Sequence, residues 1–211
     1  MGEVDGHKPD QKKQLYPSTE EEQRIHHGQY VNGLLREMGY SIPDIPEKKI
    51  GICTQIPIFI SPTFGRKISR FLSGKKPEDK PLNRFVESMC LISLGLKEQY
   101  PISKEQRVKS SYQKQRTQTP LEIDENLLKV LTEEANKHKL ELIDFLFRCI
   151  NHGMHLKNLV MRDFLNVDKP NYLHPGGYAA ESTFKMISPK NIIAYLKKNN
   201  HERTHKTPSK S

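Results

Sequence analysis

The chain has 211 residues, a formal net charge of +9 and a hydrophobic fraction of 35%, which predicts one or two modest domains with polar ends. No apolar run reaches the roughly 18 residues of a membrane span, and the polar start of the chain lacks the apolar stretch of a secretory signal, so we expect no membrane insertion. The chain has an odd number of cysteines, Cys53, Cys90 and Cys149, and none of them shows CxxC spacing. This argues against a disulfide framework and favours a cytoplasmic protein. The positive charge is typical of a protein that binds nucleic acid or an acidic surface, although a solubilising charge surplus would look the same.

The N-terminal part is expected to contain one helix. Residues 1–17 are polar and show no apolar period, which predicts disorder. Ser18 and Glu21 match a capping box that would begin a helix, and Gly39 is a natural stop. The helix and a connector rich in proline and glycine together make up residues 18–50. The apolar stripe of the helix consists of Ile25, Val31, Leu34, Leu35 and Met38.

Two segments of the chain, residues 54–98 and 117–158, follow the same pattern of one strand and two helices. Both begin with Thr-Gln-x-Pro, at Thr54 and Thr117, and continue with apolar residues at alternate positions, which is typical of a half-buried strand. A polar cap, an apolar helix, a turn and a second apolar helix follow in each segment. In the later segment, the second helix is expected to end near Gly153, because glycine often follows the last turn of a helix.

The alternation divides the side chains of each strand between an inner and an outer face. A single unit leaves both strand edges open and has a thin core, so the two strands are expected to pair antiparallel with the helices on the inner face. The polar residues 99–116 form a linker long enough to allow this pairing. The inner side chains are Ile56, Ile58 and Ile60, then Thr119, Leu121 and Ile123, and the outer ones are Gln55, Pro57 and Phe59, then Gln118, Pro120 and Glu122.

The stretch from Leu121 to Ile150 carries an alternating strand, an Asp124 cap, a helix with an inward alanine, a short turn and an apolar second helix. In this pattern and in its repetition, the chain resembles the ribbon-helix-helix superfamily of Arc, MetJ and CopG type. The resemblance implies a mainly α protein with a two-stranded antiparallel β-ribbon. Residues 51–165 would form a tandem ribbon-helix-helix pseudo-dimer, with further helices at its flanks.

The resemblance also implies a cytoplasmic protein that binds double-stranded DNA, as a transcriptional regulator or as an accessory factor in plasmid transfer, conjugation or partition. In this family the outer face of the ribbon enters the major groove, and the N-terminus of the second helix holds a phosphate. The implied DNA-binding residues are Gln55, Phe59, Gln118 and Glu122 on the strands, Arg116 in the linker, and Lys76, Lys80 and Asn83 around the first phosphate clamp, with a second clamp near Leu140 and Glu141.

The outer residues depart from the family pattern in three ways. Pro57 and Pro120 donate no hydrogen bond to a base, although proline is tolerated on a strand that has a free edge. Glu122 and Glu141 bring negative charge towards the DNA, and the first unit is basic around its clamp whereas the second is acidic. These departures favour an asymmetric DNA site, or alternatively a non-enzymatic protein-protein adaptor that has the same fold but has lost base reading.

Other constellations point to no catalytic or metal chemistry. Cys149 and His152 could share a helix face, but His155 would turn away and a closed zinc site needs a fourth ligand, so we expect a core cysteine, surface histidines and no cofactor. The adjacent His26 and His27 are expected in solvent or against a partner. The sequence contains no phosphate-binding glycine loop and no hydrolase motif, so an enzyme is not expected.

The C-terminal part is expected to add little to the core. The apolar pattern from Met154 to Leu165 predicts a further helix packed on the two units. Residues 166–196 are predicted to form a loop and then a short helix opened by Ser188 and a following proline. Residues 197–211 are basic, lack apolar side chains and are predicted to be a disordered tail.

Overall fold

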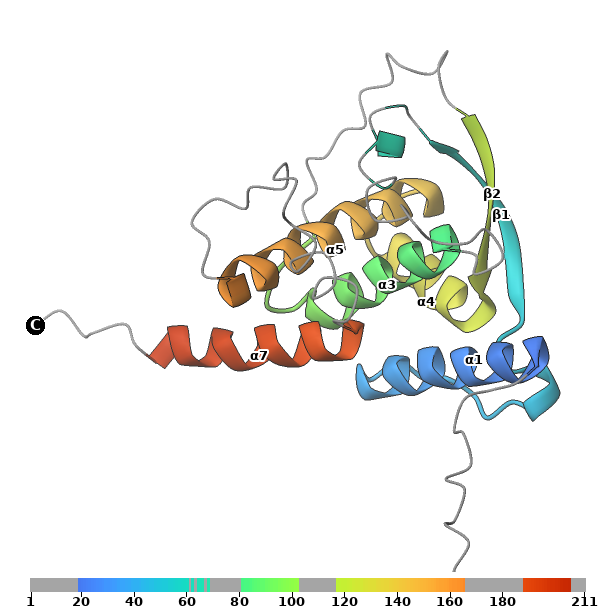
Figure 1. Cartoon of the computed structure of the whole chain (residues 1–211), viewed down its shortest axis with the longest axis horizontal. Helices are drawn as coiled ribbons and strands as arrows, with labels where there is room; N and C mark the ends of the chain where they lie inside the picture. Colours follow the sequence, from blue (N-terminus) through green and yellow to red (C-terminus); the bar gives the residue numbers. More distant parts are fainter. Residues whose placement is uncertain are drawn as a thin grey trace, which may run out of the picture.

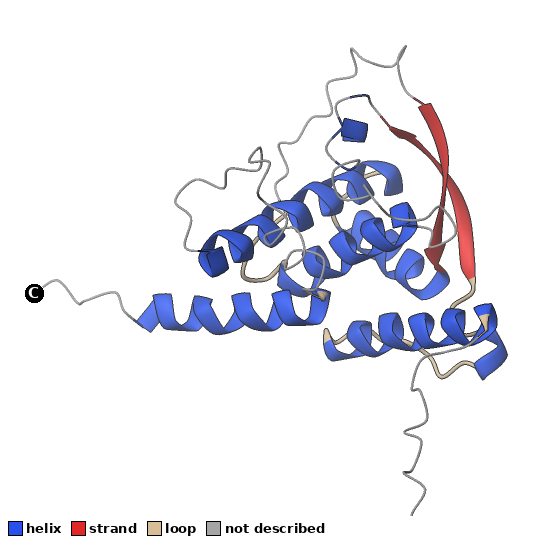
Figure 2. Cartoon of the chain, viewed as in Figure 1, coloured by secondary structure: helices blue, strands red, loops and turns tan. Residues whose placement is uncertain are grey.

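The computed structural model describes residues 19–60, 62, 64–66, 68, 81–102, 117–165 and 188–205 of the chain. Within this part the protein is mainly helical and contains one two-stranded antiparallel sheet, with the helices gathered on one side of it (Figures 1 and 2). The expectation of a mainly α protein with a two-stranded antiparallel ribbon is therefore confirmed. None of the described helices combines the length and the apolarity required to cross a membrane.

The ribbon consists of β1 (Cys53–Ile60) and β2 (Thr117–Asp124), and its register places Pro57 opposite Pro120. We call these two residues the proline pair. Opposed residues in an antiparallel ladder alternate between hydrogen-bonded and non-hydrogen-bonded pairs. The N–H groups of Glu122 and Asp124 donate to α3 and not to β1. Pro120 lies two residues before Glu122 on the same strand, so the proline pair also occupies a non-hydrogen-bonded position. No ladder bond is lost to either proline, which confirms that they are tolerated here.

The inner face of the ribbon is buried against the helices, as the alternation predicts. Ile58, Leu121 and Ile123 are inaccessible or nearly so, and they join one core cluster with residues from all the described α-helices. Burial of an aliphatic side chain of this size stabilises the fold by about 1.5–3 kcal/mol. The ribbon thus packs on the helices through its inner face.

The second unit begins its helices where the sequence predicts. Asp124 caps α4 (Glu125–Lys137), because its Oδ1 accepts from the N–H groups of Asn126 and Leu127 at 3.0 and 3.3 Å. Lys139 has a φ of 54° in the turn that leads to α5 (Leu142–Leu165). The expected cap and turn are both confirmed.

The expected helix end near Gly153 is wrong, because α5 runs unbroken through this residue to Leu165. Gly153 is buried where α5 crosses α3 (Pro81–Leu96), and a Cβ built on it would lie 2.2 Å from the backbone oxygen of Met89. The glycine therefore allows a close helix crossing instead of marking a helix end. The residues from Met154 onward belong to α5 and do not form a separate helix.

At the N-terminal end, α1 (Glu20–Glu37) begins one residue later than predicted. Its capping box joins Thr19 and Glu22, and both of its hydrogen bonds measure 3.1 Å. These two residues have the same spacing as Ser18 and Glu21, so the sequence pattern fits both pairs. The helix ends before Gly39, as expected, and the connector contains the 3₁₀ turn η1 (Glu47–Lys49). Gly28 of α1 packs so closely on Gly51 that a Cβ on Gly28 would lie 2.3 Å from the nitrogen of Gly51. This contact sets α1 against the start of β1.

The C-terminal helix α7 (Pro189–His205) is longer than predicted. Ile192, Ile193 and Leu196 are buried, and the glycine at position 95 of α3 provides room for Ile193. The tail does not become irregular at 197, because no proline or glycine stands between Leu196 and Pro208 to end the helix. The predictions for residues 1–17, for most of the 99–116 linker, for 166–187 and for 206–211 lie outside the described residues.

Candidate nucleic-acid interface

The outer face of the ribbon points away from the helices (Figure 1). Gln55, Phe59 and Gln118 are exposed on it, Phe59 with 48% of its surface accessible, and Glu122 is half-buried. The sequence thus predicted correctly which strand side chains face outward. We call this surface, comprising these four residues and the proline pair, the outer face.

The register divides the outer face into two unlike ends. Gln55 lies opposite Glu122 at one end, and Phe59 lies opposite Gln118 at the other, with the proline pair between them. Opposed side chains of non-hydrogen-bonded pairs stand about 4.5–5.5 Å apart at Cβ. Each pair can therefore act as one contact unit, polar and acidic at one end and aromatic and amide at the other.

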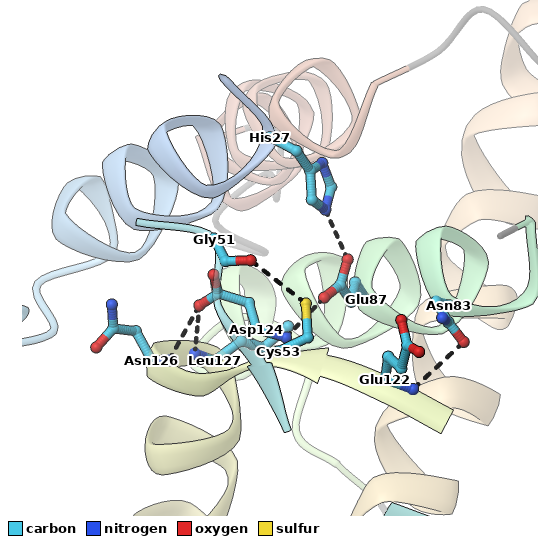
Figure 3. A network of polar contacts seen from close by, with 9 residues as sticks. All are labelled: His27, Gly51, Cys53, Asn83, Glu87, Glu122, Asp124, Asn126 and Leu127. Carbon is cyan, nitrogen blue, oxygen red and sulfur yellow. Dashed lines mark hydrogen bonds and ion pairs between the residues drawn. The ribbon is translucent and has the colours of Figure 1, made fainter. Parts of the chain in front are cut away.

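The first turn of α3 lies beside one end of the outer face (Figure 3). Asn83 Oδ1 accepts from the N–H of Glu122 at 3.4 Å, and Glu87 Oε1 accepts from the N–H of Asp124 at 2.9 Å. Asn83 and Glu87, one helical turn apart on α3, thus accept from the N–H groups of Glu122 and Asp124, which are two residues apart on β2. In this way α3 covers this edge of the ribbon. Sequence reasoning missed this arrangement, since no local pattern predicts which helix follows which strand edge.

The residues predicted around the first phosphate clamp are only partly described. Lys76, Lys80 and Arg116 lie outside the described residues, while Asn83 uses its side-chain oxygen for the ribbon backbone. Arg84, which follows Asn83 and was not singled out from the sequence, is exposed in a first turn that contains no acidic residue. A helix N-terminus without acidic residues and with an exposed arginine attracts anions.

The second predicted clamp differs from the first. The N–H of Leu140 donates to the oxygen of Ala135 at 3.0 Å, so it is already used within the α4–α5 turn. Glu141 is exposed beside it and brings negative charge. Of the two predicted clamps, only the one at α3 has a first helical turn without acidic residues.

A buried polar network joins α1, α3, β2 and α4 near the same end of the ribbon (Figure 3). His27 Nε2 lies 2.7 Å from Glu87 Oε2, and Glu87 and Asp124 retain only 3% and 2% of their accessible surface. Burial raises the pKa of Asp124 to about 6, although the N–H groups at the start of α4 oppose the rise. His27, expected in solvent or against a partner, instead contacts Glu87, while His26 is exposed.

The cysteine and one of the two histidines of α5 face Ser93 of α3. Cys149 is fully buried, as expected, and burial raises the pKa of its thiol to about 12. Ser93 Oγ lies 2.9 Å from His152 Nδ1, and burial, with His155 nearby, lowers the pKa of His152 to about 4. His152 is thus half-buried, contrary to expectation, whereas His155 is exposed. Among the described residues, no three His, Cys, Asp or Glu side chains are grouped so as to hold a metal ion.

Comparison with known proteins finds no relative. No protein family matches the chain, and no curated protein or solved structure is similar to it.

Proposed function

We propose that this protein binds double-stranded DNA as a fused ribbon-helix-helix pseudo-dimer, and acts as a transcriptional regulator or as an accessory factor in plasmid transfer, conjugation or partition. The observation that carries the proposal is the strand register. Pro57 and Pro120 occupy the same position in the two sequence repeats, and they lie directly opposite each other. Pairing of equivalent residues is what an internal two-fold axis through the ribbon requires.

The helices support the same interpretation. The second helices of the two repeats, α3 and α5, pack against each other, and Gly153 allows their close crossing. In the first repeat, Phe64 and Ile68, which the sequence assigns to the first helix, are buried in the same core. Two strand-helix-helix units that share one core account for this arrangement.

The major groove admits a two-stranded ribbon, and the outer face would turn its side chains toward the base edges there. Gln55 and Gln118 are equivalent in the repeat, and a glutamine amide can bond both N6 and N7 of adenine. The first turn of α3, with Arg84, would contact a phosphate and set the register of the ribbon on the duplex. The net charge of +9 would favour association with DNA.

A protein-protein adaptor is the second candidate. It is favoured by Phe59, which is 48% exposed next to the proline pair. An aromatic side chain and two prolines make an apolar centre, and such patches often mark protein interfaces. In this case the outer face would pack on a protein partner and would not read bases.

Fluorescence anisotropy with labelled duplex DNA tests the proposal on the full chain. We expect binding that weakens as salt rises from about 50 to 200 mM, because phosphate contacts release counterions. The double variant Gln55→Ala/Gln118→Ala should still bind but should lose its preference for one sequence over another by roughly 5- to 150-fold, as expected for lost base contacts. Gln99→Ala is the matched control, since Gln99 is exposed beyond the other end of α3.

Two results would contradict the proposal. Absence of binding even at low salt would exclude DNA binding and leave the adaptor. Unchanged sequence preference in the double variant would exclude Gln55 and Gln118 as base-reading residues.

A further inference from the structure

We infer that the DNA site is non-palindromic, with one end read by Gln55 and Glu122 and the other by Phe59 and Gln118. The inference rests on the proposed DNA binding and goes beyond it by stating what each end of the ribbon recognises. It follows from the register and the chemistry of the outer face.

The register fixes the composition of each end. An internal two-fold axis through the proline pair would exchange Gln55 with Gln118, and Phe59 with Glu122. The glutamines are identical under this exchange, but a phenyl ring replaces a carboxylate. The two ends therefore share one contact and differ in the other.

Geometry gives the spacing of the two contacts. Each contact pair lies two residues from the proline pair, so the ends are four residues apart, or about 13 Å along a strand. This corresponds to about four base pairs at 3.4 Å each. The proline pair lies over the centre of this interval and offers no N–H donor or polar side chain, so the central base pairs are not read by direct hydrogen bonds from it.

The side chains determine the bases at the two ends. Glutamine selects adenine at both, since its amide matches N6 and N7. A carboxylate accepts from the N4 amino group of cytosine, so Glu122 selects cytosine at the first end. The ring of Phe59 contacts the methyl group of thymine, which selects thymine at the second end.

The flanking helix adds to the asymmetry. Asn83 Oδ1 accepts from the N–H of Glu122, which places the first turn of α3 next to the Gln55–Glu122 end. In the second repeat, the N–H of Leu140 is used by Ala135 and Glu141 is acidic. The two ends of the outer face therefore also differ in the helix that flanks them.

Selection from a randomised duplex library with the full chain tests the inference. The wild-type protein should enrich a non-palindromic site with adenine and cytosine at one end and adenine and thymine at the other, about four base pairs apart. Phe59→Glu makes the two contact pairs chemically alike, and because Phe59 is exposed the variant should fold, which circular dichroism would check. This variant should enrich a palindromic site, with a change in preference from thymine to cytosine of roughly 5- to 150-fold at the second end only.

Glu122→Gln provides the complementary variant, because it keeps the shape of the side chain and removes its charge. It should weaken the preference for cytosine at the first end and leave the second end unchanged. A palindromic wild-type site, or a site that Phe59→Glu does not alter, would overturn the inference while DNA binding itself stands. Failure of the wild-type chain to bind any duplex at low salt would overturn the proposed function, and the inference with it.

Discussion

At the scale of single residues, Asp124 combines two demands that oppose each other. Its carboxylate caps α4, a role that favours the charged form, yet it is buried beside Glu87, which disfavours that form. Burial dominates and raises its pKa to about 6. Ionisation of the cap at neutral pH therefore lowers the free energy of unfolding.

The pH dependence of stability should show this cost. The folded-state pKa of Asp124, about 6, exceeds the ordinary value of an aspartate carboxyl, 3.8, so its stabilising contribution is complete below pH 3.8 and is lost as pH rises through 6. Asp124→Asn keeps a capping oxygen and removes the titration. The free energy of unfolding of the variant, relative to wild type, should rise between pH 4 and pH 7 by roughly 3 kcal/mol at most.

Urea unfolding at the two pH values measures this difference. Asp144→Asn, at an exposed position in the first turn of α5, is the control and should show no comparable change. Parallel pH profiles for wild type and Asp124→Asn would show that the buried carboxyl does not titrate as described.

At the scale of elements, the crossing of α3 and α5 depends on a missing side chain. A Cβ on Gly153 would meet the backbone oxygen of Met89 at 2.2 Å, and backbone cannot move aside as a side-chain tip can. Gly153→Ala should therefore lower the free energy of unfolding by about 1–3 kcal/mol or more, as in other overpacked interiors.

Gly33→Ala is the matched control within α1. Nothing lies within 4 Å of the Cβ that it would add, so the variant should gain about 0.5–1 kcal/mol from the better helix propensity of alanine. Chemical denaturation of both variants checks the pair. Equal effects of the two substitutions would mean that the close crossing does not constrain the helices.

The elements also show what the sequence can and cannot predict. Strand alternation and the Asp124 cap are local patterns, and both were predicted correctly. Gly153 was misread because a glycine at a helix crossing and a glycine at a helix end look the same without knowledge of the neighbouring helix. The start of α1 was ambiguous for a local reason, since two overlapping residue pairs had the spacing of a capping box.

At the scale of the whole molecule, α1 and α7 are parts of the same core as the ribbon. Val31 and Leu35 of α1 and Leu196 of α7 belong to the cluster that contains Ile58 and Leu121. The outer face was predictable because it depends on alternation within each strand. The contacts that support it, such as His27 with Glu87, join segments far apart in the chain and could not be derived from periodicity.

If α1 belongs to one cooperative unit with the ribbon, a cavity in α1 should weaken the ribbon as well. Leu35 is completely buried, so Leu35→Ala should lower the free energy of unfolding by about 2–5 kcal/mol. Hydrogen exchange of the ladder amides of β1 and β2, at Ile58 and Leu121 among others, should lose protection by the same amount as global unfolding.

Leu196→Ala makes the same comparison from α7, whose side chain at 196 is also buried. Exposed Lys198→Ala on the same helix should leave the protection of the ribbon amides unchanged. A ribbon that keeps its protection in Leu35→Ala while the amides of α1 exchange faster would show that α1 opens independently. In that case the network of His27, Glu87 and Asp124 would be a detachable contact, and α1 would not be needed to hold the outer face in place.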